Sequence, residues 1–194
     1  MKILCFGDSN TYGYDPRALL DNRYPADVRW TDVLARDTGW TVLNMGQNGR
    51  EIPCRPAEII RITKAISREM PDILVVMLGS NDLLCHSDFG AEQTAARMET
   101  FLRTLPPVRI LLVSPPPMQR GTWVCEERLL TESARLAAQY AALACKLGIF
   151  FADAGQWGVE LTFDGVHFSE AGHHAFANGI RQKLEGILFP SSWQ

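Results

Sequence analysis

The chain has 194 residues, of which 46% are hydrophobic and 21% are charged, and its formal net charge is −3. This length and apolar content predict one domain with a substantial core, spanning residues 1–194, and argue against a disordered chain. The weak negative charge lacks the basic excess of a nucleic-acid-binding protein, so no nucleic-acid partner is expected.

Signals for membranes, disulfides and metals are missing from the sequence. No apolar run reaches the ~18 residues that cross a bilayer, and the stretch after Met1 and Lys2 is too short for a signal peptide. We therefore expect no membrane partner and a cytoplasmic location. The five cysteines include no Cys-x-x-Cys pair, which fits free thiols in a reducing compartment. Cys85 and His86 lack two further ligands at suitable spacing, so neither a metal nor another cofactor is expected.

A strand and a polar turn open the chain. Residues 3–6 are apolar at consecutive positions, as in a strand that is covered on both faces. Gly7-Asp8-Ser9 follow at its carboxyl end, which is where open parallel sheets bind their ligands. Ser9 is therefore a candidate nucleophile. The same composition is common in ordinary turns, because Asp and Ser bond to their own backbone and Gly tolerates positive φ.

Helices and strands alternate along the rest of the chain, after a polar, proline-interrupted segment over 12–29 that predicts a long loop. Apolar periodicity and capping signals predict a helix over 30–36, a strand over 40–43, a helix from 56 until Pro71, a strand over 73–78, a helix over 90–105, a strand over 109–113, a helix over 126–147, a strand over 148–151 and a helix over 170–188. This alternation predicts a three-layer α/β/α sandwich with a five-stranded parallel sheet, as in flavodoxin-like folds.

Polar residues recur where the predicted strands end. Ser9 follows the first strand, Gly49 the second and Asn81 the third, and Asp164 and His167 follow the fifth. We expect them to converge at one edge of the sheet. A serine becomes a nucleophile when a histidine takes its proton and a carboxylate orients that histidine. The N–H groups of Ser9 and Gly49 and the Asn81 amide can then stabilise the negative charge on a substrate oxygen.

Four sequence blocks resemble those of the SGNH (GDSL-type) esterases, in order and over essentially the whole chain. The blocks are Gly7-Asp8-Ser9-Asn10, Gly49 after Asn44, Gly79-Ser80-Asn81-Asp82 and Asp164-Gly165-Val166-His167. The resemblance implies the SGNH hydrolase fold, with Ser9 as nucleophile, His167 as base and Asp164 as the partner that orients it. It also implies an oxyanion hole formed by Ser9, Gly49 and Asn81.

A closer likeness is to the mycobacterial arylesterase and acyltransferase branch of this family. It is carried by residues 2–9, 27–31, 112–117 and 151–154. The branch implies a cytosolic homo-oligomer that acts on small acyl groups. This chain departs from the pattern at Asn10, where the family name has Leu, and in shorter segments after Asp82 and Leu105.

Several other residues have two interpretations each. Asn10 and Trp123 are candidates for contact with the substrate, and Trp30, Trp123 and Trp157 belong either to the core or to the wall of a pocket. Arg29 and Asp82 are expected to be structural. His173 and His174 lie in the predicted last helix and are expected to face solvent or to pack against neighbouring residues.

Two classes of function remain open from the sequence. The first is a serine esterase that acts on small-molecule esters with short-chain acyl, acetyl or aryl groups, with acyltransferase activity or O-deacetylation of carbohydrates as variants of the same mechanism. The second is a non-catalytic, flavodoxin-like module in which Ser9, Asn10 and Thr11 hold a phosphate or nucleotide at a helix N-terminus. The second hypothesis leaves Asp164 and His167 unexplained.

Overall fold

The computed structural model describes residues 1–18 and 22–189. Within these residues it contains one five-stranded sheet in the order β2-β1-β3-β4-β5, and all of its strand pairs are parallel. The strands are β1 (Lys2–Gly7), β2 (Thr41–Gly46), β3 (Ile73–Met77), β4 (Ile110–Ser114) and β5 (Phe150–Asp153). The predicted α/β/α sandwich is confirmed.

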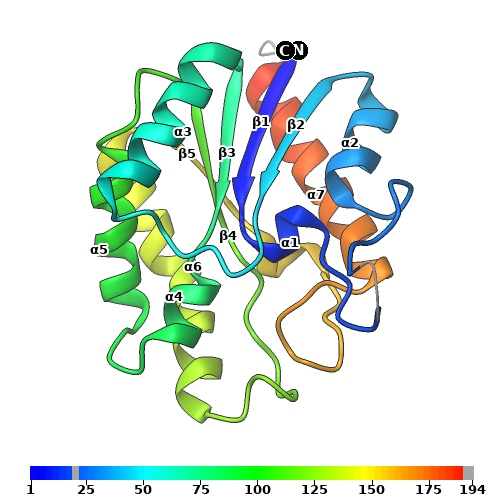
Figure 1. Cartoon of the computed structure of the whole chain (residues 1–194), viewed down its shortest axis with the longest axis vertical. Coiled ribbons are helices and arrows are strands. Elements are labelled where there is room, and N and C mark those ends of the chain that lie inside the picture. The colour runs from blue at the N-terminus through cyan, green and yellow to red at the C-terminus, as the bar shows by residue number, and fades with distance from the viewer. Residues whose placement is uncertain (19–21, 190–194) are drawn as a thin grey trace, which may run out of the picture.

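Helices cover both faces of the sheet (Figure 1). On one face lie α2 (Trp30–Thr38) and α7 (Glu170–Leu188), and on the other lie α3 (Pro56–Glu69), α5 (Ala91–Leu102) and α6 (Glu127–Leu147). Side chains of β1 alternate between the two layers, because Ile3 and Cys5 pack toward α2 and α7 while Leu4 and Phe6 pack toward α3, α5 and α6. Burial on both faces explains why this strand is apolar at every position.

The carboxyl ends of the central strands are level with one another. Gly7 at the end of β1 is paired with Gly46 of β2 and with Met77 of β3. The chain therefore leaves three neighbouring strands at the same height. The segments that carry Ser9, Gly49 and Asn81 start from this one edge, as predicted.

Three short helices follow strands and were not predicted. They are α1 (Ser9–Tyr12), α4 (Ser80–Cys85) and the 3₁₀ turn η1 (Ala154–Trp157). Each has a sequence typical of a turn, and a helix of one turn has too few residues to show apolar periodicity. The start of the predicted 12–29 loop is thus the end of α1, and residues 19–21 of that loop lie outside the described part of the chain.

Two predicted strands are displaced along the chain. β2 runs on to Gly46 instead of ending at Leu43, and β5 starts at Phe150 and reaches Asp153. Gly148 ends α6 with φ 65°, so it cannot also begin a strand. Among residues 1–18 and 22–189, none of the helices combines the length and the hydropathy that crossing a bilayer requires.

Candidate active site

Ser9 is the first residue of α1, directly after β1. Asp8 caps the helix by accepting a hydrogen bond from the backbone N–H of Asn10 at 3.0 Å. Gly7 makes this sharp strand-to-helix turn possible, because a Cβ there would lie 2.0 Å from Thr11 Oγ1 and 2.9 Å from the Met77 carbonyl oxygen. The turn leaves the Ser9 side chain almost fully buried at the edge of the sheet.

Ser9, His167 and Asp164 form one hydrogen-bonded chain. His167 Nε2 lies 3.0 Å from Ser9 Oγ, and His167 Nδ1 lies 2.6 Å from Asp164 Oδ2. A carboxylate can only accept, so Nδ1 donates to Asp164 and the neutral imidazole keeps a lone pair on Nε2 facing the Ser9 hydroxyl. The structure thus brings together all three residues predicted for nucleophilic chemistry.

The carboxylate of Asp164 is held in place by a tight turn. Its Oδ1 accepts hydrogen bonds at 2.9 Å from the backbone N–H groups of Val166 and His167 and from Thr162 Oγ1. Burial raises the pKa of Asp164, but the bonds from the His167 ring and from these amides outweigh it and bring the pKa to about 2. Asp164 is therefore ionised at neutral pH.

Asn10 connects α1 to the loop that carries His167. Its Nδ2 donates to the Val166 carbonyl at 3.1 Å, and its Oδ1 accepts from the Phe168 N–H at 2.9 Å. These are the residues on either side of His167, and Asn10 is only 3% exposed. Asn10 was a candidate for substrate contact, but its amide is instead bonded to the protein backbone.

The groups predicted for the oxyanion hole lie on the loops after β2 and β3. Gly49 is exposed and has φ 69°, a conformation that side chains rarely adopt. Asn81 Nδ2 donates one hydrogen bond to the Arg50 carbonyl at 3.0 Å, and its second N–H has no partner among residues 1–18 and 22–189. The Asn81 amide therefore joins these two loops and keeps one donor.

Asp82 is structural, as predicted. It is fully buried, accepts from the Ile52 N–H at 3.1 Å and forms an ion pair with Arg97 at 3.1 Å. Burial raises its pKa. Asn81 and Asp82 together tie α4 to the segment 50–52 that follows Gly49.

Two aromatic rings enclose the imidazole of His167. The ring centroid of Tyr14 lies 4.7 Å from that of His167, and the ring centroid of Trp123 lies 5.0 Å from it in an edge-on arrangement. Trp123 is 52% exposed and therefore lies at the mouth of the site. Tyr14 was missed, because it lies in the predicted loop with no signal that distinguishes it. Trp30 and Trp157 pack against Phe176 in the core.

Other polar residues have roles away from the Ser9–His167 pair. Arg29 bonds with Asp32 at 2.8 Å, and His173 is buried against Tyr24 and Phe168, while His174 is exposed. Within residues 1–18 and 22–189, His, Cys, Asp and Glu side chains form no cluster of three that could hold a metal ion. The cysteines in this part of the chain are free.

Comparisons with known proteins identify the family of this chain and similar structures. Residues 5–175 match the model of the GDSL-like lipase/acylhydrolase family. The native aryl esterase of M. smegmatis shares 28% identity and a TM-score of 0.81, with 96% of this chain and 99% of that one covered. A carbohydrate acetylesterase family member from Sinorhizobium meliloti shares 27% identity and a TM-score of 0.83, covering 96% and 98%. No curated protein matches the sequence.

Proposed function

Because the chain belongs to the GDSL-like lipase/acylhydrolase family and is an ester hydrolase, we propose that it is a serine esterase that cleaves small carboxylic esters through Ser9, His167 and Asp164. The observation that carries the proposal is the continuous chain of hydrogen bonds, with 3.0 Å from Ser9 to His167 and 2.6 Å from His167 to Asp164. A binding module without chemistry has no need of such a chain.

The first half of the reaction acylates Ser9. His167 Nε2 takes the hydroxyl proton while Ser9 Oγ attacks the ester carbonyl carbon, and Asp164 stabilises the imidazolium that forms. The carbonyl oxygen becomes negatively charged, and the N–H groups of Ser9 and Gly49 and the Asn81 amide stabilise it. His167 then gives its proton to the alcohol oxygen as the C–O bond breaks, which leaves an acyl group on Ser9.

The second half of the reaction releases the acid. Water gives a proton to His167 Nε2 and attacks the acyl carbonyl, and the same donors stabilise the second tetrahedral species. His167 returns the proton to Ser9 Oγ when the acyl–oxygen bond breaks. An alcohol in place of water would give acyl transfer by the same steps.

The partly exposed Trp123 favours an aryl or other apolar group at the mouth of the site, and the likeness to the M. smegmatis aryl esterase supports this class. The likeness to a carbohydrate acetylesterase family member supports O-deacetylation of carbohydrates as a second candidate. Turnover of acetyl, butyryl and octanoyl aryl esters, compared with turnover of acetylated oligosaccharides, separates the two substrate classes.

Labelling with a fluorophosphonate probe tests the nucleophile. We expect one equivalent of label on the wild-type protein and none on Ser9→Ala, which should also lose esterase activity by at least about 10³-fold. The exposed Ser87 offers a matched control, because Ser87→Ala should be labelled and remain active. Labelling or near-normal activity of folded Ser9→Ala would contradict the proposal.

A further inference from the structure

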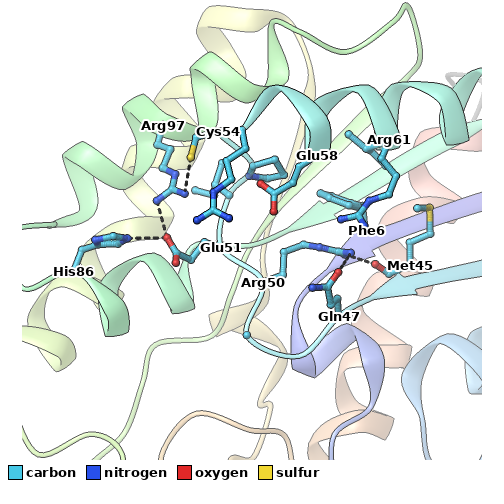
Figure 2. A pocket seen from close by; sticks show the side chains of 15 residues that line it. Phe6, Met45, Gln47, Arg50, Glu51, Cys54, Glu58, Arg61, His86 and Arg97 are labelled. Atoms are coloured by element: carbon cyan, nitrogen blue, oxygen red, sulfur yellow. Dashed lines mark hydrogen bonds and ion pairs between the residues drawn. The ribbon is translucent and has the colours of Figure 1, made fainter.

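A cavity of about 350 Å³ lies next to Gly49 but is not lined by Ser9 or His167. Figure 2 shows its walls, which come from the end of β1, the segment after β2, the first turns of α3, the end of α4 and α5. The volume falls in the range of small-molecule sites. Charged side chains dominate the lining of the cavity. The kind of ligand that it could bind therefore depends on how its positive and negative charges balance.

One guanidinium in the cavity is paired with two carboxylates. Arg97 bonds with Glu51 at 2.8 Å and with Asp82 at 3.1 Å. Glu51 also accepts a hydrogen bond from His86, at 2.7 Å. Glu51, His86 and Arg97 lie together at the cavity (Figure 2), and Asp82 pairs with Arg97 from the core.

The other charged residues that line the cavity have an excess of positive charge. Arg50, Arg55 and Arg61 have no carboxylate within ion-pair distance in the described part of the chain, and Glu58 is the one further carboxylate in the lining. Arg61 extends from α3 toward Arg50 and Phe6 (Figure 2), and its charge lowers the pKa of Arg50. Three guanidinium groups and one carboxylate leave an excess of two positive charges.

Arg50 is fixed by contacts that do not neutralise it. Its guanidinium lies 4.3 Å above the ring of Phe6, and Nη1 donates to the carbonyls of Gly7 and Met45 while Nη2 donates to Gln47 Oε1. These bonds use three of its five N–H donors. Burial is the largest cause of a pKa lowered to about 10, so the group is charged at neutral pH. The Asp8 and Glu58 carboxylates attract it from beyond ion-pair distance. A half-buried cation that is held rigidly and forms no ion pair in the described part of the chain suits an anion.

We propose that this cavity binds the carboxylate or phosphate group of a small molecule through Arg50, Arg55 and Arg61. Planar guanidinium groups bond such oxyanions with two N–H donors at once, and the excess charge attracts them from solution. The anion is either the acidic end of the ester substrate, which would reach the site past Gly49, or a free small anion. Both kinds of anion would bind the guanidinium groups in the same way. Only an anion that belongs to the substrate would change KM for the ester.

Binding of inorganic phosphate tests the site without reference to hydrolysis. Calorimetric titration in a zwitterionic buffer at constant ionic strength should give saturable binding to the wild-type protein and to Ser9→Ala alike. The double variant Arg55→Gln/Arg61→Gln should bind phosphate at least about tenfold more weakly, since charge-assisted hydrogen bonds are lost. Because Ser9→Ala is included, the result does not depend on the proposed serine chemistry.

Two controls separate a site from general attraction by surface charge. Lys64→Gln/Arg68→Gln removes the same amount of charge from α3 outside this cavity and should bind phosphate as the wild type does. Glu58→Gln removes the carboxylate inside the cavity and should tighten binding about tenfold. Damage to the fold cannot produce this increase.

Matched esters identify the source of the anion. The 4-nitrophenyl esters of butyric acid and of succinic acid have similar length, and only the second carries a free carboxylate. If the substrate supplies the anion, Arg55→Gln/Arg61→Gln should raise KM for the succinate ester relative to the butyrate ester by about tenfold. If a free anion is bound, that ratio stays constant while phosphate still binds. Failure of phosphate to bind the wild type, together with a constant ratio, would overturn the proposal.

Discussion

Asn10 is a residue whose role follows from two hydrogen bonds. Its amide bonds to both neighbours of His167, so it sets the position of the imidazole relative to Ser9, which lies beside Asn10 in α1. The sequence drew attention to Asn10 only because the family name has Leu there. We therefore expect Asn10 to position His167, because its amide is bonded to the protein backbone on both sides of that residue.

Replacing Asn10 by Leu should therefore lower kcat more than it changes KM. It leaves the Val166 carbonyl and the Phe168 N–H unpaired in a buried place, which costs about 1–3 kcal/mol of stability for each group. Turnover is measured at a temperature where both proteins are folded. Asn10→Asp keeps the acceptor for the Phe168 N–H, so its kcat should lie between that of the wild type and that of Asn10→Leu. Normal kcat in a destabilised Asn10→Leu would show that Asn10 only stabilises the fold.

Asn81 is expected to act on the transition state. An oxyanion donor binds the charged tetrahedral oxygen more strongly than the neutral ester carbonyl, so Asn81→Ala should lower kcat by roughly 10²–10³-fold and leave KM nearly unchanged. Steady-state kinetics and thermal unfolding of this variant distinguish an effect on the transition state from an effect on stability. A protein that loses stability but keeps its turnover would mean that Asn81 serves only to bond the Arg50 carbonyl.

At the scale of elements, α1 is held together by its neighbours rather than by its own sequence. A Cβ on Gly46 would lie 2.1 Å from the Tyr12 nitrogen, so α1 packs directly onto the end of β2. Asn44 donates to the Thr11 carbonyl at 2.7 Å. Four residues form too short a helix to be stable in isolation. The position of Ser9 thus depends on β2 as well as on β1.

The cap of α1 predicts a pH-dependent stability. Burial raises the pKa of Asp8 to about 6 from an ordinary value of 3.8, so the folded protein keeps a proton there that the unfolded chain has lost. The contribution of Asp8 to stability is therefore fully present below pH 3.8, falls as the pH rises and is lost above about 6. This loss amounts to roughly 3 kcal/mol at most.

Denaturant unfolding of the wild type and of Asp8→Asn between pH 4.5 and 7.5 measures this effect. Asn keeps an oxygen for the Asn10 N–H but cannot ionise, so the variant should gain stability over the wild type as the pH rises. All other titrating groups are shared and cancel in the difference. A difference that is constant with pH would mean that Asp8 does not titrate in this range.

At the scale of the whole molecule, we expect a homo-oligomer. Trp123 and Phe163 are 52% and 59% exposed and lie on neighbouring segments that are joined by backbone bonds from Thr122 to Phe163 and from Trp123 to Asp164. Large apolar side chains exposed side by side favour association. The contact would border the mouth of the site.

Light scattering at micromolar concentration should give a multiple of the chain mass, 21.7 kDa. Phe163→Ser should reduce the measured mass. Met70 is 79% exposed after α3, near the amino end of β3, so Met70→Asn is a control that should not change it. A wild-type mass of 21.7 kDa alone would refute association.

The sequence by itself determined the sheet, the order of its strands along the chain and the three residues of the hydrogen-bonded chain. Apolar runs such as 73–77 are buried on both faces and leave a strong pattern, and parallel strands bring their polar ends to one edge. Ser9, Asp164 and His167 were recognisable because their residue types and positions follow from the chemistry of a nucleophile.

Only the tertiary structure decided what surrounds those residues. Asn10 bonds to residues 156 and 158 positions away, Tyr14 reaches His167 from a loop, and Arg50 lies over Phe6. Such contacts join parts of the chain that are far apart in sequence, so no local periodicity or spacing marks them. These contacts depend on how the loops pack at the sheet edge. A single sequence contains the residues that come into contact there but does not show which of them do.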